Sequence, residues 1–130
     1  NTSPGGSMHY LDFNRHTQAH LFRAGLEGIA FAFAHGFAIL RDLGLDPEVI
    51  RVGNDNLFRS TIFSQTVAHL LQCSIQVYAT TGAVGAAHAS AKGEQADITG
   101  TSPAEVYEPG PDATPYQAAF ERWSQVLSKT

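Results

Sequence analysis

Basic residues and cysteine are both scarce in this chain of 130 residues, and each scarcity excludes a class of function. Eight lysines and arginines stand against twelve aspartates and glutamates, giving a formal net charge of −4. With no basic stripe for a phosphate backbone and no polybasic cluster for anionic lipid, neither nucleic acid nor a membrane is expected as a partner. The one cysteine, Cys73, cannot build a disulfide framework, and its apolar neighbours predict a small buried side chain in a reducing, cytoplasmic compartment.

The chain also lacks a long uninterrupted hydrophobic run. Its most apolar window, residues 24–40, is short for a bilayer span and contains Glu27, His35 and three glycines, so it predicts a core helix. No secretory signal pattern opens the sequence, and residues 1–12 predict a loop that leads into the domain. The length and the apolar content of 43% fit one domain with a core of its own.

Three segments have the periodicity of amphipathic helices. The first spans residues 17–43 and ends at Gly44; the second spans 60–72, with Ser60 as its cap; the last begins at 114–117, where a capping box coincides with a proline. Within the first helix, residues 29–34 are apolar on every face. Such a helix requires partners on both sides, which are either missing from this chain or supplied by another copy of it.

Two consecutive strand-then-helix units predict an α/β fold with two parallel strands and about four helices. The strand at 49–52 runs into the loop 53–56, and the strand at 75–78 runs into 80–82. The carboxyl ends of such strands lie side by side, where open α/β sheets bind nucleotides and phosphates. A Gly- and Ala-rich helix at 82–91 fits either tight packing or a sliding contact between lobes, and residues 93–112 predict an irregular surface connection.

Few side chains suggest chemistry. Gly53 allows close approach of a ligand, and Asn54 and Asn56 offer amide groups, although an ordinary turn has the same composition. His16 and His20 are spaced like a metal-binding pair without a third ligand, so no metal site is expected. No serine or cysteine nucleophile with an adjacent base and no P-loop lysine occurs, so we expect no catalytic residue in this chain.

Another pair on the first helix has a structural interpretation. Arg23 and Glu27 are four residues apart, where the helix turns toward burial. A carboxylate in such a place must find a partner, so we interpret Glu27 as a polar anchor bonded to Arg23 or to backbone, in preference to a catalytic role.

Three motifs, in order, resemble the FGGY carbohydrate kinases, and xylulose kinases in particular. Residues 16–31, HTQAHLFRAGLEGIAF, are similar to the HTRAHLxRAxLEGxAF helix of that family. Residues 50–60 resemble its strand, glycine-rich adenosine loop and following serine, and residues 81–87 resemble the GAxGAA helix at its interdomain hinge. The resemblance covers about residues 10–95.

The resemblance implies a fold and a function. The family has a two-lobed, actin-like ATPase architecture with ribonuclease-H-like lobes, and it transfers the γ-phosphoryl group of Mg-ATP to a sugar hydroxyl. Residues 1–130 would be the carboxyl-terminal, ATP-binding part, a partial lobe whose first three strands lie upstream. The sites that carry over are nucleotide binding at Gly53, Asn54, Asn56 and Ser60, and the interdomain hinge helix at Gly82, Gly85 and Ala86.

Departures from the family pattern limit what this chain can do. Gly-Asn-Asp replaces the commoner Gly-Gly-Gly, and Asp55 would repel nucleotide phosphates. The phosphate-binding motifs and the catalytic aspartate are absent, so we expect no activity without the upstream lobe. The expected partners are that lobe, ATP with Mg²⁺ and a small sugar, and the exposed strand edge should promote self-association. The alternative is a stand-alone, non-catalytic α/β interaction or oligomerisation module.

Overall fold

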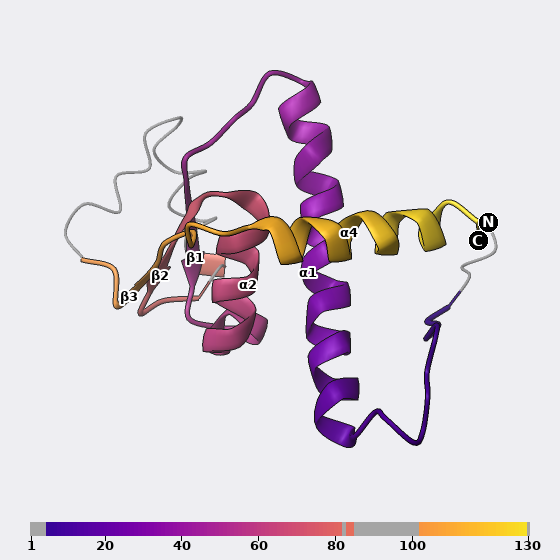
Figure 1. Ribbon diagram of the computed structural model, residues 1–130. Coiled ribbons are helices and arrows are strands. Elements are labelled where there is room, and N and C mark those ends of the chain that lie inside the picture. Colours follow the sequence, from indigo (N-terminus) through magenta and orange to yellow (C-terminus); the bar gives the residue numbers. More distant parts are fainter. Residues whose placement is uncertain (1–4, 82, 85–101, 130) are drawn as a thin grey trace.

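The computed structural model describes residues 5–81, 83–84 and 102–129, which form a three-stranded sheet packed with helices (Figure 1). The strands are β1 (Val49–Gly53), β2 (Ser74–Tyr78) and β3 (Glu105–Tyr107), in the order β1-β2-β3. The α-helices are α1 (Gln18–Asp42), α2 (Thr61–Leu71) and α4 (Thr114–Leu127), and a short 3₁₀ helix, η1 (Asn56–Arg59), follows β1.

The sheet confirms the predicted parallel pair of strands and corrects the prediction of an irregular connection at residues 93–112. β1 and β2 run parallel with Ile50 opposite Ile75, as the two strand-helix units predict. Residues 93–112 are not wholly irregular, because β3 pairs antiparallel with β2 inside that segment. The β-forming pair Val106-Tyr107 explains the strand, and the register places Tyr107 opposite the fully buried Ile75. The short run and its flanking prolines concealed it.

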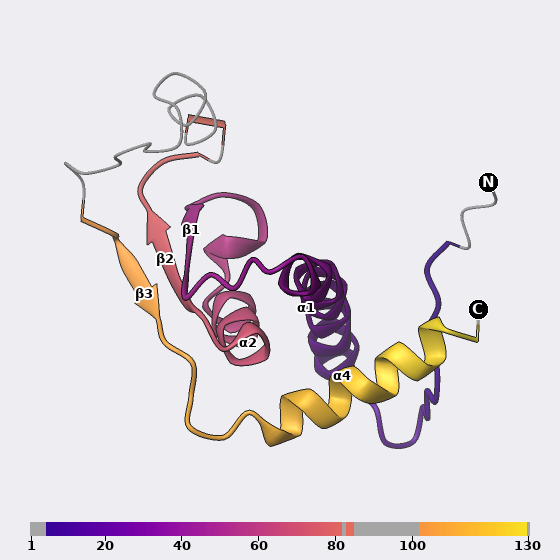
Figure 2. The ribbon, with the colours of Figure 1, turned by 90° about the horizontal axis from the view of Figure 1, so that it is seen from above.

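The helices form layers on one side of the sheet. Viewed from above, α2 lies between the sheet and α1, and α4 crosses beside both helices (Figure 2). The core therefore combines the inner face of β2, one face of α2 and one face of α1. The largest of its fully buried side chains, each less than 2% exposed, are Ile75, Val67, Val77, Cys73 and Ser64.

The ends of α1 explain its length. At its start the Thr17 backbone N–H donates to Nδ1 of His20 at 3.1 Å. At its end Gly44 has a φ of +83°, the left-handed conformation that glycine adopts without steric cost. The N–H groups of Gly44 and Leu45 donate to the carbonyls of Arg41 and Leu40, which is the Schellman pattern. The predicted glycine stop is confirmed.

The start of α4 differs from the prediction. Ala113, not Thr114, occupies the N-cap position, and no side chain caps the helix there. The Thr114 backbone N–H instead donates to Oδ1 of Asp112 at 3.0 Å, and hydrogen bonds from Thr114 lower the pKa of that carboxyl group. Gln117, the expected second partner of a capping box, donates to the Leu70 carbonyl at 3.3 Å. A tertiary contact with α2 has replaced a local one.

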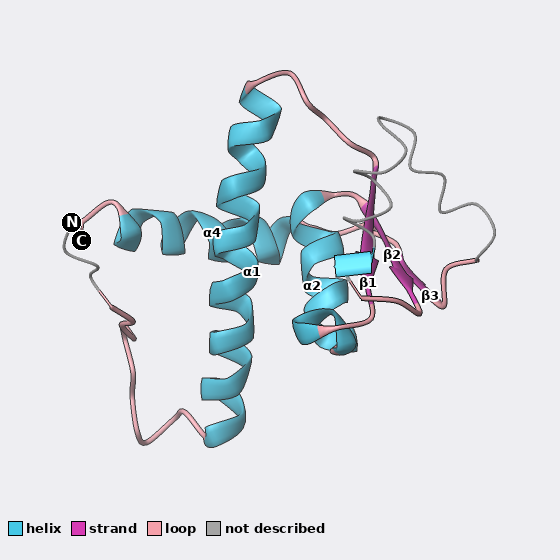
Figure 3. Cartoon of the chain, turned by 180° about the vertical axis from the view of Figure 1, so that it is seen from behind, coloured by secondary structure: helices cyan, strands magenta, loops and turns pink. Residues whose placement is uncertain are grey.

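One face of α1 is apolar and uncovered. One face of the helix is buried through Ala30, Phe31, Ala34 and Phe37. Large apolar side chains outside that face are exposed, namely Phe22, Ile29, Phe33, Ile39 and Leu40. A Cβ built on Gly25, Gly28 or Gly36 meets nothing within 4 Å. By length and composition alone α1 could cross a bilayer, with 22% of its most apolar window buried. In the folded chain α1 packs against α2 and α4 (Figure 3).

The thiol of Cys73 is expected to be slow to react. It is 1% exposed and its Sγ donates to the Pro47 carbonyl at 2.9 Å, and burial raises the pKa of the thiol above its usual value. Ellman's reagent should therefore label native protein only as fast as the protein opens, and unfolded protein at once. Native labelling at the rate of a free thiol would show that this region opens readily.

Candidate nucleotide-binding edge of the sheet

The predicted loop lies where β1 and β2 end together. Gly53, the last residue of β1, is buried and stands opposite Tyr78, the last residue of β2. The Asn54 backbone N–H donates to the Tyr78 carbonyl at 2.8 Å, which extends the parallel pairing by one bond. The Asn54 and Asn56 side chains belong to exposed residues. Gly53, Asn54 and Asn56 are thus brought together at one edge, as expected from parallel strands.

Local conformation explains how the loop turns into a helix. Asn56 has a φ of +49°, a left-handed conformation that asparagine tolerates better than most residues. Asp55 precedes it as the cap residue of η1. Ser60, the fourth predicted residue, follows η1, and its Oγ accepts a hydrogen bond from the Phe63 backbone N–H at 3.3 Å. Ser60 therefore caps α2, as the sequence predicted.

We expect the change Ser60→Ala to cost about 0.5 to 2 kcal/mol of folding free energy, because it removes the N-cap acceptor of α2. Ser60→Asp, which keeps a cap acceptor, should retain most of the stability. Urea denaturation of the two variants compares them directly. If Ser60→Ala were as stable as the parent while nucleotide affinity fell, the hydroxyl would serve the ligand and not the helix.

The hinge-helix residues Gly82, Gly85 and Ala86 lie outside the described residues. The structure does describe the start of that segment. The Val84 backbone N–H donates to the carbonyl of Thr81 at 3.1 Å and to its Oγ1 at 3.4 Å, and residues 83–84 are helical. The predicted cap residue Thr81 is in the expected place.

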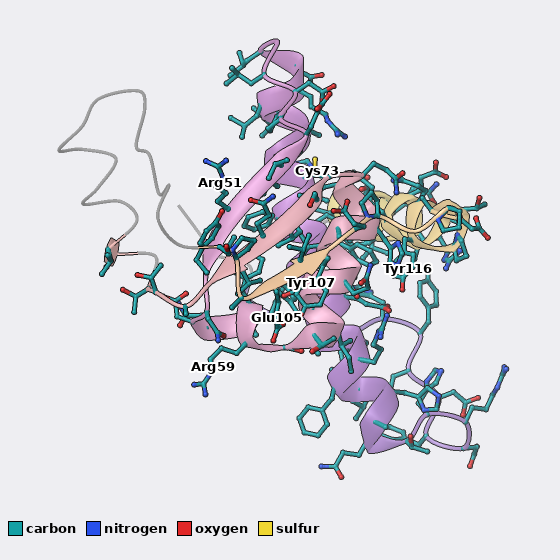
Figure 4. All side chains as sticks on the ribbon, turned by 90° about the vertical axis from the view of Figure 1, so that its left-hand side faces the viewer. Arg51, Arg59, Cys73, Glu105, Tyr107 and Tyr116 are labelled. Atoms are coloured by element: carbon teal, nitrogen blue, oxygen red, sulfur yellow. The ribbon has the colours of Figure 1, made fainter. Side chains whose placement is uncertain are left out.

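A polar cluster close to α2 was missed by sequence reasoning. The hydroxyl of Tyr107 donates to a Glu105 carboxylate oxygen and lies 3.5 Å from Oγ1 of Thr61, the first residue of α2. The bond to Glu105 raises the pKa of Tyr107. Figure 4 shows Glu105 and Tyr107 over the start of α2, while Arg59 extends outward from the protein. The strand-like run Glu105–Tyr107 was the available signal, but Thr61 is 46 residues away from Tyr107 in the sequence.

The carboxyl ends of β1 and β2 offer groups that could bind an adenosine and few that could bind a triphosphate. Exposed amide side chains can bond to a base or ribose, and a buried glycine lets a ligand approach the backbone. The Asn54 N–H is already bonded to Tyr78, and Asp55 would repel phosphate. In the described part of the chain no group of three His, Cys, Asp or Glu residues could hold a metal ion. These residues could hold the nucleoside portion of a nucleotide, and Mg²⁺ would need ligands from elsewhere.

The remaining candidate side chains form hydrogen bonds within the chain. His16 and His20 each accept a backbone hydrogen bond through Nδ1, from Asp12 at 3.0 Å and from Thr17 at 3.1 Å. Arg23 Nε donates to Oε1 of Glu27 at 2.6 Å, and this bond raises the pKa of the guanidinium. Arg23 and Glu27 thus form the anchoring pair that the sequence suggested.

The site and the layers define a mixed α/β unit with a sugar-kinase-like fold. One solved structure similar to this chain is the xylulose kinase from Rhodospirillum rubrum, with a TM-score of 0.72 and 28% sequence identity over 92% of this chain. The match covers 26% of that enzyme, so this chain spans about a quarter of its length. No family model and no curated protein matches the sequence.

Proposed function

We propose that this chain is part of a carbohydrate kinase of the FGGY type, one that phosphorylates a ketopentose such as xylulose with Mg-ATP. The chain contributes the adenosine side of the nucleotide site and is inactive alone. The observation that carries the proposal is the likeness of nearly the whole chain to part of a xylulose kinase. The order of the three sequence motifs supports the same assignment.

The uncovered surfaces support a role as one part of a larger lobe. In the described part of the chain β1 pairs with β2 alone, so its other edge has no partner strand. The apolar face of α1 is uncovered as well, and Ile62 of α2 is 50% exposed. Upstream strands that pair with β1 would extend the sheet into a ribonuclease-H-like lobe and cover apolar surface on the helices. We therefore propose the upstream lobe of the same polypeptide as the partner.

The first experiment determines the mass of the natural gene product with an antibody against residues 112–130. A band several times heavier than 13.9 kDa supports the kinase, and the purified protein is then assayed for ADP release with ATP and xylulose. A band near 13.9 kDa, or a heavy protein that transfers no phosphoryl group to any ketopentose, contradicts the proposal.

A substitution at the loop tests the nucleotide role in that full-length enzyme. Asn54→Ala removes one amide and should raise the KM for ATP by about 2- to 12-fold, the value of one hydrogen bond, with the KM for xylulose unchanged. Asn14→Ala, another exposed asparagine far from the loop, is the matched control. Equal KM values for ATP in both variants would show that the Asn54 side chain does not contribute to nucleotide binding.

The alternative is that the chain exists alone as an interaction module. In that case the edge of β1 that has no partner strand in the described residues would be its interaction surface. Such a module should self-associate through that edge and the α1 face. Light scattering of the 130-residue chain measures this directly, and a compact monomer would contradict it.

A further inference from the structure

A partly open cavity of about 280 Å³ lies between residues 8–11 and the first turns of α1, away from the nucleotide edge. In Figure 1 this amino-terminal segment turns back beside the lower half of α1. The cavity walls are largely apolar, with Met8 and Leu11 on one side and Leu21 and Ala24 on the helix side. Its size suits a small organic molecule, and its walls suit one with a hydrocarbon body.

Two of the polar lining residues, His16 and His20, lie at the start of α1; the others are His9, Tyr10, Arg23 and Glu27. Nδ1 of His16 accepts the Asp12 N–H and Nδ1 of His20 accepts the Thr17 N–H, so in each neutral ring the proton is on Nε2. The ring centroids are 5.9 Å apart. Both Nε2 atoms are consequently hydrogen-bond donors, whereas a metal ion requires an unprotonated nitrogen. The arrangement selects a ligand that accepts hydrogen bonds.

The charge around the cavity favours an anion as that acceptor. Arg23 and Glu27 both line it, and their ion pair at 2.6 Å already neutralises the single carboxylate among the lining residues. The first turn of α1 contains no acidic residue. No acidic side chain of that turn therefore offsets the positive end of the helix dipole.

We propose that this cavity binds a small carboxylic acid as its anion. The carboxylate accepts hydrogen bonds from Nε2 of His16 and His20, and the hydrocarbon body packs against Met8, Leu21 and Ala24. Inorganic phosphate would satisfy the donors but leave the apolar walls in contact with water. The site is separate from the nucleotide edge and does not depend on kinase activity.

The test is an NMR titration of the isotope-labelled 130-residue chain with sodium benzoate at constant ionic strength. A ligand of about nine non-hydrogen atoms should bind with a Kd on the order of 1 to 10 mM, shifting the methyl signals of Met8, Leu21 and Ala24. Benzyl alcohol, which has the ring without the charge, and sodium phosphate, which has the charge without the ring, should each bind more weakly by about tenfold or more.

Variants assign the binding to the histidines. In His16→Asn/His20→Asn, each side-chain carbonyl can replace Nδ1 as acceptor while Nε2–H is lost, and benzoate should bind about tenfold more weakly or worse. His35→Asn, on the same helix outside the cavity, should leave the affinity unchanged. Ala24→Leu adds bulk to the cavity wall while keeping both imidazoles, so it should also weaken benzoate binding. This variant provides the test if the double variant unfolds.

Four results would overturn the proposal. These are equal affinity for benzoate and benzyl alcohol, phosphate binding as tight as benzoate, zinc chloride binding at the two histidines, or no shift of the lining residues at about ten times the expected Kd.

Discussion

Replacing Gly110 by alanine is expected to destabilise the folded chain by about 1 to 3 kcal/mol, the usual cost of overpacking. A Cβ at this position would overlap Cε1 of His69 and lie 2.9 Å from its Nδ1. The ring is not free to move away. Its Nδ1 accepts the Gly110 backbone N–H at 2.8 Å, and the ring stacks on Tyr116 with centroids 5.0 Å apart. Urea denaturation followed by circular dichroism measures the loss.

The control is a double-mutant cycle. His69→Ala has a cost of its own, because it removes the stacked ring and the acceptor, but it also removes the atoms that a new Cβ would meet. Gly110→Ala made in the His69→Ala background should therefore cost little. If Gly110→Ala costs the same in both backgrounds, the backbone at Gly110 and not the contact with His69 determines its effect.

The same junction shows why part of the fold was beyond sequence reasoning. Gln65 Nε2 donates to the Glu108 carbonyl at 2.8 Å, so α2 fixes the chain between β3 and α4. Position 110 requires a glycine because a histidine 41 residues earlier in the chain lies against it. No local sequence pattern indicates such a contact. The periodic helices and the parallel strands were predictable because their signals are local. The loop at Gly53 was predictable for the same reason.

The missed elements all depend on long-range partners. β3 is only three residues long and is stabilised by pairing with β2 and by burial of Tyr107. Thr114 and Gln117 have the composition of a capping box, yet Gln117 bonds to α2 instead. The uncovered face of α1 was anticipated, because apolar residues on all sides of a helix require more partners than two strands supply. We propose that the upstream lobe of the same polypeptide covers it.

Phe31→Ala is expected to be the most damaging single change, with a loss of about 3 to 5 kcal/mol, because it empties a well-packed aromatic site. Phe31 is 6% exposed, and its ring lies 5.9 Å from Phe120 and 6.0 Å from Trp123 between centroids. These contacts attach α4 to α1. Trp123 is the chain's one tryptophan, so its fluorescence reports the docking of α4, and the variant should show a solvent-shifted emission before global unfolding.

Phe33→Ala, two residues along the same helix, is the matched control. Its side chain is 42% exposed and meets Phe58 at 6.2 Å between ring centroids, so its removal should cost less than half as much as the loss of Phe31. Trp123 emission should not change. Equal costs for the two variants in the 130-residue chain would mean that a second copy covers Phe33. If the proposed upstream lobe covers this face, the cost of Phe33→Ala should instead rise to that of a core residue in the full-length protein, because the same phenyl ring would then be buried.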